Sequence, residues 1–362
     1  MRFHKALLIL IMSTCLILGA CASSSAPEPE GASADGMLIS ETEGSAETEE
    51  SAESEETTGT EESAETEETT VPETSEETTE EETTPEEETF SHLGITDGIL
   101  KYEDVRGYFF RTEFHEDWPQ NDYDQSAFVM ADGRMTYTGE GYTYRLGIDV
   151  YEAYGYIDWT AVKEDGYDFA FMRIGYRGYA QPDLLVDRNW IINLHDAYLA
   201  GMDVGVYFFS QAITEEEAKE EADFIIETLT NDGYTPDILK MGVAFDPEYT
   251  GDSGARTNDL TRDQVTKNAR AFCDRIREAG YTAMIYSNMV WEDRNFDLSQ
   301  LSDIDIWYAD YTAYPQTPYA FSVWQYGHGE SKGVEGAVDV NIQLIPVGEE
   351  LTESDASSEP ES

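Results

Sequence analysis

From Leu146 onward, the sequence alternates between short apolar runs and segments with helical periodicity. Two of the intervening helices open on capping boxes, at 214–217 and 261–264. Repeated strand–helix units indicate a parallel sheet, and this many units in about 200 residues favour a closed barrel. The predicted fold class is therefore α/β, a TIM-like (β/α) barrel over residues 146–347. Its strands are expected at 146–150, 169–174, 204–209, 242–245, 283–286, 304–308 and 322–326, with a last strand around Asp339.

The N-terminus reads as a targeting segment. Arg2 and Lys5 precede an apolar run, Ala6–Leu18, that is short for a membrane span. The run leads into Leu18-Gly19-Ala20-Cys21, which resembles the lipobox of bacterial lipoproteins. Residues 1–21 are therefore expected to be a lipoprotein signal peptide. Cleavage before Cys21 would leave that cysteine as the lipidated N-terminus, anchored to the outer face of the bacterial cell membrane.

Three further segments are distinguished by composition. Residues 22–89 are rich in Glu and Thr and contain no Lys or Arg, so they are expected to form a disordered acidic linker. Residues 90–145 are rich in aromatic and turn residues and predict a small β appendage, with a hairpin formed by 134–137 and 142–145. Residues 348–362 are expected to be an acidic disordered tail.

Charge and motif content exclude several classes of protein. The formal net charge of −55 argues against nucleic acid as a partner. No Gly-x-Gly-x-x-Gly or P-loop follows an expected strand, so the nucleotide-binding alternatives lose support. The histidines show no paired ligand spacing, so neither a metal site nor a cofactor is expected. Cys273 stands alone in the expected barrel and is interpreted as a buried apolar residue.

Carboxylates recur where the barrel strands end. Asp246 and Glu248 lie two residues apart after an apolar run, so on a strand they project to the same side. Asp149 closes the first strand and Asp339 lies in the last. Because those two strands are neighbours in a closed barrel, Asp149 and Asp339 should flank one another. Four acidic side chains on one face repel each other, so a functional role explains their presence better than a structural one. A carboxylate pair at this end of a barrel suggests hydrolysis of a glycosidic bond.

At this point the sequence resembles a known family. Gly147-Ile148-Asp149-Val150 and Phe171-Met172-Arg173-Ile174-Gly175-Tyr176 are similar to the opening of the family 25 glycoside hydrolases, lysozymes (N-acetylmuramidases) that cut peptidoglycan. The resemblance covers about residues 147–342 and implies an irregular β/α barrel. It continues through Gly205-Val206-Tyr207-Phe208-Phe209, Phe245-Asp246-Pro247-Glu248, Ile285-Tyr286-Ser287-Asn288, Ile306-Trp307-Tyr308-Ala309, Trp324-Gln325-Tyr326 and Val338-Asp339-Val340-Asn341. Tyr151 and Pro247 depart from the family, which often has Ser and an aromatic residue there.

The resemblance also implies roles. Glu248 would be the general acid for the β-1,4 bond between N-acetylmuramic acid and N-acetylglucosamine, with Asp246 as stabiliser or orienter. Asp149 and Asp339 would complete an acidic floor. Whether Asp246 or the substrate's acetamido group is the nucleophile stays open. Arg173 is expected to pair with the acidic floor, and the other expected substrate-binding residues are Tyr207, Tyr286, Trp307, Gln325 and Tyr326.

Two alternatives differ in function class. One is a barrel that binds glycan without cutting it, held on the tether formed by residues 22–89. The other is a glycosidase on the same barrel that acts on chitin-like chains. The intact set of four carboxylates argues against the binding module, whereas only the geometry of the groove separates the two enzymes.

Overall fold

The computed structural model describes residues 94–104 and 106–348. The expected signal peptide with Cys21, the expected acidic linker and the tail from residue 349 lie outside the described residues. No described helix is long and apolar enough to cross a lipid bilayer.

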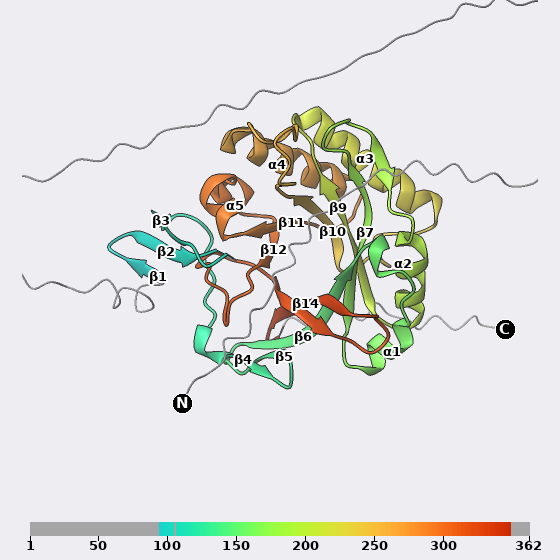
Figure 1. The fold of residues 1–362 in the computed structure, drawn as a ribbon, viewed down its shortest axis with the longest axis horizontal. Helices are drawn as coiled ribbons and strands as arrows, with labels where there is room; N and C mark the ends of the chain where they lie inside the picture. Colours follow the sequence, from blue (N-terminus) through green and yellow to red (C-terminus); the bar gives the residue numbers. More distant parts are fainter. Residues whose placement is uncertain (1–93, 105, 349–362) are drawn as a thin grey trace, which may run out of the picture. The chain divides into compact units, whose positions relative to one another are not determined.

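The fold is built on a nine-stranded sheet whose ends join (Figure 1). The ring runs in the order β6–β14–β13–β12–β11–β10–β9–β7 and closes because β6 also pairs with β7. The ninth strand, β8, pairs with β7 outside the ring. The predicted barrel is therefore confirmed. Its strands are β6 (Tyr142–Val150), β7 (Phe169–Arg177), β8 (Leu184–Val186), β9 (Asp203–Ser210), β10 (Gly242–Pro247), β11 (Ala283–Asn288), β12 (Asp305–Ala309), β13 (Val323–Glu330) and β14 (Ala337–Pro346).

Within the closed ring, one strand departs from the expected parallel arrangement. β14 runs antiparallel to both of its neighbours, β13 and β6. Asp339 therefore lies near the start of its strand and not at the end. Because the strand direction is reversed, Asp339 still reaches the edge of the barrel where the parallel strands end, and it faces Asp149 in register.

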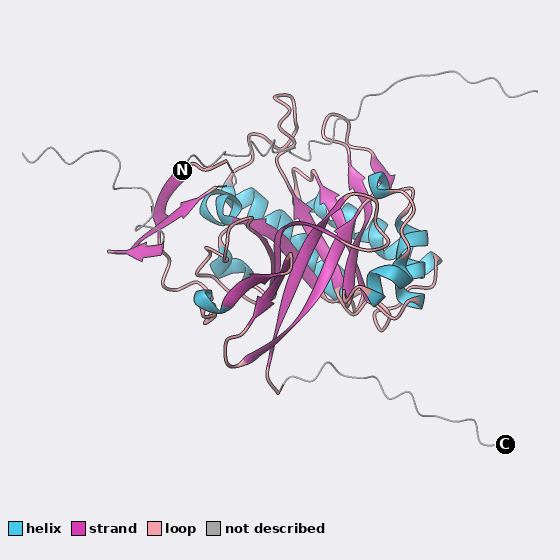
Figure 2. Ribbon diagram, turned by 60° about the horizontal axis from the view of Figure 1, so that its bottom comes forward, coloured by secondary structure: helices cyan, strands magenta, loops and turns pink. Residues whose placement is uncertain are grey.

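Helices cover part of the barrel wall (Figure 2). Helices α2, α3 and α4 pack on β7, β9, β10 and β11. The two expected capping boxes are confirmed at their N-caps, because Thr214 and Thr261 accept hydrogen bonds from the backbone N–H groups of Glu217 and Gln264. The helices are α1 (Trp159–Glu164), α2 (Trp190–Leu199), α3 (Glu215–Asn231), α4 (Arg262–Glu278) and α5 (Met289–Arg294), with 3₁₀ turns η1 (Gln125–Ala127), η2 (Glu152–Tyr154) and η3 (Leu298–Leu301).

Side-chain alternation divides the barrel into an interior and an outer layer. Phe245 points outward against Phe272 of α4, with ring centroids 5.0 Å apart, whereas Ala244 belongs to the interior cluster. The interior cluster is apolar and contains Phe169, Phe171, Tyr207, Met241, Ala244, Met284, Tyr286, Trp307, Ala309 and Val323. Polar side chains follow it toward the C-terminal ends of the parallel strands, so the polar end of the barrel is the candidate site.

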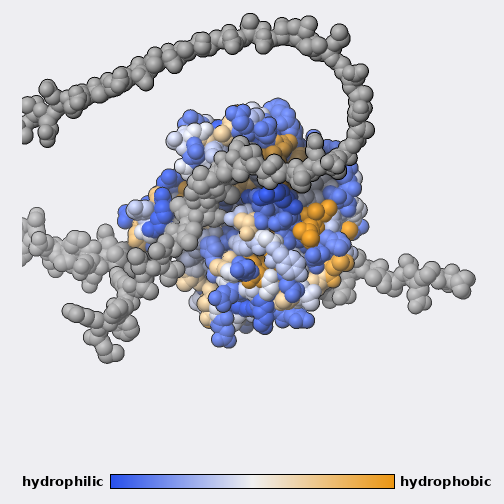
Figure 3. Space-filling view, turned by 45° about the vertical axis from the view of Figure 1, so that its right-hand side comes forward, coloured by the Kyte–Doolittle hydropathy of each residue, from blue (hydrophilic) through white to orange (hydrophobic). Residues whose placement is uncertain are grey.

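The N-terminal β segment packs on the barrel. Its strands form one three-stranded sheet, β1 (Gly94–Thr96), β2 (Ile99–Glu103) and β3 (Phe109–Glu113), and one hairpin, β4 (Phe128–Ala131) with β5 (Arg134–Tyr137). The expected hairpin of 134–137 with 142–145 is wrong, because 134–137 pairs with β4 and 142–145 begins β6. Phe128 meets Trp324 of β13 at 5.2 Å, and both belong to the same buried cluster. The visible outer face of the described part is mostly hydrophilic, with small hydrophobic patches (Figure 3).

Candidate active site

Asp246 and Glu248 stand together at the end of β10. Asp246 is the last residue but one of the strand and is 5% exposed, and Glu248 follows Pro247 directly and is partly exposed. By strand alternation, Asp246 lies above the interior residue Ala244. The backbone oxygen of Glu248 accepts a hydrogen bond from Gln211 at the end of β9, which fixes the chain just after the strand.

Asp149 and Asp339 come together as expected, in register on β6 and β14. One oxygen of Asp149, Oδ2, accepts hydrogen bonds from the amide groups of Gln325 at 2.9 Å and Asn341 at 2.8 Å. The two oxygens of Asp339 are held separately, Oδ2 by the Tyr154 hydroxyl at 3.1 Å and Oδ1 by His328 at 2.9 Å. Both carboxylates are therefore fixed by donors from other elements.

Gln325 connects the carboxylates to two tyrosines. Its amide oxygen accepts hydrogen bonds from the hydroxyls of Tyr286 and Tyr311, each at 2.8 Å, while its nitrogen donates to Asp149. Because two hydroxyl groups donate to its oxygen, the Gln325 amide presents its N–H₂ group to the Asp149 carboxylate. Gln325 thus orients Asp149.

Arg173 forms an ion pair with Asp187, a residue that the sequence prediction overlooked. The Arg173 Nη2 atom lies 2.9 Å from Asp187 Oδ2, and both side chains are buried. The guanidinium also lies over the Tyr151 ring, 4.7 Å from its centroid. Arg173 faces Tyr207 in the register of β7 and β9, so this cation lies beside the barrel interior.

The expected groove-lining aromatics fall into two groups. Tyr207 and Tyr286 belong to the interior cluster at the carboxylate end. Trp307 is 1% exposed, stacks on Phe171 at 4.4 Å and donates to Asn341, so it lies beneath the polar layer and supports it. Tyr326 points out of the barrel toward Trp324, because it is one residue out of phase with Gln325. Both side chains are almost fully buried, and their expected roles in substrate binding stay predictions.

The site raises the pKa values of two carboxyl groups. Burial, followed by the charge on Asp339, raises the pKa of Asp149 to about 8, although the amides of Asn341 and Gln325 oppose the shift. Burial and the charge on Asp339 also raise the pKa of Glu248 to about 7. A carboxyl group that keeps its proton near neutrality can serve as a general acid.

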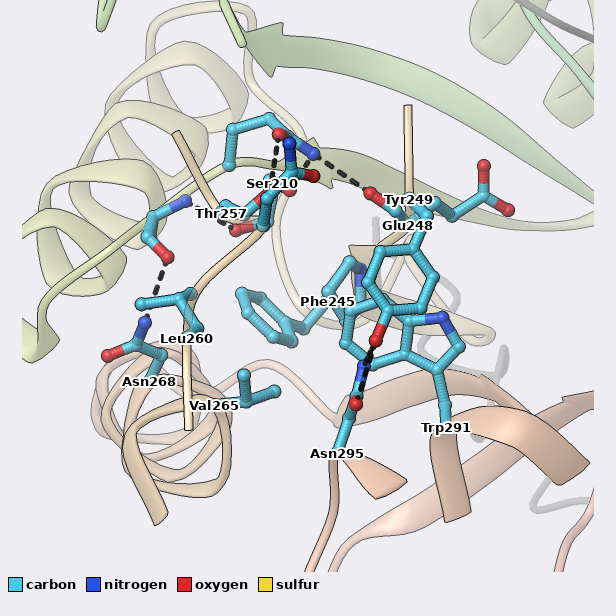
Figure 4. A pocket seen from close by; sticks show the side chains of 14 residues that line it. Ser210, Phe245, Glu248, Tyr249, Thr257, Leu260, Val265, Asn268, Trp291 and Asn295 are labelled. Atoms are coloured by element: carbon cyan, nitrogen blue, oxygen red, sulfur yellow. Dashed lines mark hydrogen bonds between the residues drawn. The ribbon is translucent and has the colours of Figure 1, made fainter. Parts of the chain in front are cut away.

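A small recess lies beside Glu248, between the end of β10 and helix α4 (Figure 4). The Tyr249 and Trp291 rings lie side by side there, with centroids 5.0 Å apart, and the Tyr249 hydroxyl is 2.9 Å from Asn295 Oδ1. The Glu248 carboxylate is turned away from α4 in this view. The recess is also lined by Ser210, Gln211, Thr257, Asn258 and Asn268.

Several site residues were missed by the sequence prediction. Asn341 lies inside a motif that carries the family resemblance but has no expected role, and the sequence pattern of the histidines bears only on metal binding. Tyr154 and Tyr311 lie in connections beyond the strands, where periodicity gives no signal. Within 94–104 and 106–348, no group of three or more His, Cys, Asp or Glu side chains is arranged to hold a metal ion.

Two curated proteins with lysozyme in their names are similar in sequence to this chain. An autolytic lysozyme of Clostridium acetobutylicum is 25% identical over 198 residues, which is 54% of this chain and 54% of that protein. Lysozyme-like protein 7 of Caenorhabditis elegans is 21% identical over 168 residues, 46% of this chain and 55% of that protein. The chain therefore spans about half the length of these curated relatives.

Solved structures are similar as well. The modular autolysin LytC from Streptococcus pneumoniae has a TM-score of 0.48 at 23% identity, covering 69% of this chain and 57% of that one. A family 25 glycosyl hydrolase from Bacillus anthracis has a TM-score of 0.44 at 21% identity, covering 59% and 94%. The family model of "Glycosyl hydrolases family 25" matches residues 148–334, which is more than half of the chain and contains Asp149, Asp246 and Glu248. This chain belongs to glycosyl hydrolase family 25.

Proposed function

We propose that this protein is a peptidoglycan hydrolase of the lysozyme type. It would cleave the β-1,4 bond between N-acetylmuramic acid and N-acetylglucosamine. The observation that carries the proposal is Glu248, a partly exposed carboxyl group with a pKa raised to about 7, two residues from the buried Asp246 at the polar end of the barrel. Family membership and the lysozyme names of the relatives support the same substrate.

The residues divide the reaction between them. Protonated Glu248 donates its proton to the glycosidic oxygen as the bond from that oxygen to the anomeric carbon breaks. Asp246 stabilises the positive charge that develops on the sugar, or orients the acetamido group that attacks the anomeric carbon. A water molecule then attacks that carbon and gives its proton to the Glu248 carboxylate, which restores the acid.

Of the two acids on β6 and β14, Asp339 acts on Glu248 through its charge. Asp339 carries the charge that follows burial in raising the pKa of Glu248, and Asp149 is placed opposite Asp339. Tyr207 and Tyr286, whose rings lie 5.8 and 5.0 Å from the Trp307 ring, form the side of the interior nearest these acids.

We also propose that the enzyme works outside the cytoplasm, anchored by lipid on Cys21. The support is the sequence alone: a positive start, an apolar run and the Leu18-Gly19-Ala20-Cys21 box. Residues 22–89 would hold the barrel away from the membrane and toward the wall. Remodelling of the cell's own wall is the role that fits an anchored enzyme.

The test uses the full-length protein, Glu248→Gln and an exposed control, Glu278→Gln, whose side chain is 72% exposed. Each is incubated with purified peptidoglycan, and the reducing ends of the released fragments are identified. We expect the wild type and the control to release fragments with muramic acid reducing ends. The rate of their release should be at least about 100-fold lower in Glu248→Gln. Glucosamine reducing ends would mean that the enzyme cuts the other β-1,4 bond of the strand, at C1 of N-acetylglucosamine. Activity on chitin oligosaccharides alone would indicate a chitin-type glycosidase. Glycan binding without fragments would indicate a binding module.

A further inference from the structure

A β-bulge in β13 brings His328 to the carboxylates. Gln325 faces Asn341, but the next paired residues are Gly327 with Val340 and His328 with Asp339, so Tyr326 is the extra residue. Gly327 has a φ of +146°, a conformation that favours glycine. In a regular strand His328, three positions after Gln325, would project to the opposite face. The bulge turns it to the same face as Gln325.

His328 makes a direct contact with Asp339. Its Nε2 atom is 2.9 Å from Asp339 Oδ1, while Tyr154 donates to the other oxygen. The Tyr311 ring is edge-on to the imidazole, with centroids 5.3 Å apart. The Tyr311 hydroxyl donates a hydrogen bond to Gln325, which in turn donates to Asp149. The His328 side chain is 46% exposed and that of Asp339 is 18% exposed, so the pair lies at the edge of the site.

We propose that His328 is a positioning residue of this centre, which holds Asp339 in place and compensates its charge, and thereby sets the pH range in which Glu248 remains a proton donor. The inference rests on the proposed function of Glu248. The inference adds His328, which the bulge in β13 places at the site, to the four carboxylates. Neither the carboxylate motif nor the spacing of the histidines in the sequence indicates this residue.

The charges around His328 give the direction of the effect. The groups that face it are Asp339 from β14, Asp149 from β6, Tyr154 from η2 and Tyr311 from the segment after β12. The hydrogen bond to Asp339 and the charges on Asp339 and Asp149 raise the pKa of His328, although burial opposes this. His328 therefore keeps its positive charge to a higher pH than an unperturbed imidazole does.

That positive charge acts on Glu248 through Asp339. The Asp339 charge favours the protonated form of Glu248. A cation on Asp339 weakens this influence, because the two charges largely cancel at the distance of Glu248. Removal of the cation should therefore allow Glu248 to keep its proton to a higher pH.

The experiment compares pH–rate profiles of the full-length wild type, His328→Gln, His328→Lys and His195→Gln on peptidoglycan. His195 is a matched control, since it is 56% exposed and 3.1 Å from the Asp196 carboxylate on α2. In His328→Gln the alkaline limb should move up by roughly half a pH unit. His328→Lys, which keeps the charge, should stay near the wild type, and His195→Gln should coincide with it. An unchanged limb in His328→Gln, or a shift to lower pH, would overturn the inference.

A second measurement does not depend on activity. The pKa of His328 is determined by NMR titration in the wild type and in Asp339→Asn. A lower value in Asp339→Asn is expected, because the hydrogen-bonded charge is removed, and equal values would refute the contact. If the wild type releases no fragments at any pH but the NMR shift is present, the proposed function fails while the coupling between His328 and Asp339 stands.

Discussion

Asp149 and Asp339 face each other directly across the antiparallel pair β6–β14. Like charges opposite one another on neighbouring strands normally destabilise a sheet. Here the cost is reduced in two ways, because amides of Gln325 and Asn341 solvate Asp149 and His328 and Tyr154 hold Asp339. The remaining repulsion helps to raise the pKa of Asp149, so the pair binds a proton more readily than two separate acids.

Hydrolysis should fail on the alkaline side as Glu248 loses its proton. Since the pKa of Glu248 is about 7, the acid is protonated below this pH and ionised above it. We expect kcat/KM on peptidoglycan to decline by about tenfold for each pH unit above the pKa of Glu248. The measurement is kcat/KM from pH 4 to pH 9, with Glu278→Gln as control. Constant activity up to pH 9 would contradict Glu248 as the acid.

Gln325→Leu should impair the site more than it harms the fold. The substitution removes the amide that orients Asp149 and leaves the hydroxyls of Tyr286 and Tyr311 without their acceptor. We expect kcat to fall by roughly 10- to 100-fold and the free energy of unfolding to fall by about 1–3 kcal/mol.

The matched control is Gln300→Leu. Gln300 also donates its amide to a carboxylate, Asp297, but at an exposed position. Its rate and denaturation midpoint should stay close to those of the wild type. Equal kcat values for Gln325→Leu and Gln300→Leu would show that the orientation of Asp149 does not matter for the reaction.

The sequence predicted the acidic end of the barrel because the rules involved are local. The apolar run predicts that Asp246 and Glu248 come at the end of a strand, and β10 does end at Pro247, between them. Barrel closure predicts Asp149 beside Asp339, and the register of β6 and β14 confirms that pairing. Strand direction is different, because no residue of β14 marks it as antiparallel. The bulge at Tyr326 could not be predicted either, since it follows from pairing with β14 and not from composition.

The hairpin error has a physical reason that the sequence did contain. Both 134–137 and 142–145 have strand composition, and period alone does not select a partner. The turn between β4 and β5 is Asp132-Gly133, with φ values of 51° and 80°. Asp-Gly suits the two-residue hairpin turn that requires positive φ at both positions. The sequence therefore favours a hairpin closed by Asp132-Gly133 over one closed by the longer Thr138–Gly141 connection.

Cys21→Ser should release the protein from membranes. The thiol is the acceptor of the lipid in the expected processing, and Ser offers no equivalent site. Cells expressing wild type, Cys21→Ser and Cys15→Ser would be fractionated, and the protein in membranes and medium quantified. Wild type and Cys15→Ser are expected in the membrane fraction and Cys21→Ser in the medium. Wild-type protein found mainly in the medium would contradict the anchor.

A buried acid away from the site should make stability depend on pH. Glu292 on α5 is 1% exposed; its Oε2 atom accepts from Thr317, whereas Oε1 has no hydrogen-bond partner in the described part of the chain. Burial raises the pKa of Glu292 to about 8, and the nearby charge of Asp310 contributes. At a pH between the two pKa values, Glu292 is protonated in the folded protein and ionised in the unfolded chain. The contribution of Glu292 to the free energy of unfolding therefore falls as the pH rises toward 8.

Glu292→Gln should remove this dependence, because the amide stays neutral at every pH. One pKa unit corresponds to about 1.4 kcal/mol, so the variant should gain about 3–4 kcal/mol on the wild type between pH 5 and pH 8. Denaturant unfolding at both pH values measures the difference, and pH effects of the catalytic carboxylates cancel because both proteins retain them. Glu278→Gln, at an exposed position, should run parallel to the wild type. A Glu292→Gln curve that also runs parallel would mean that Glu292 is ionised in the folded protein at pH 5.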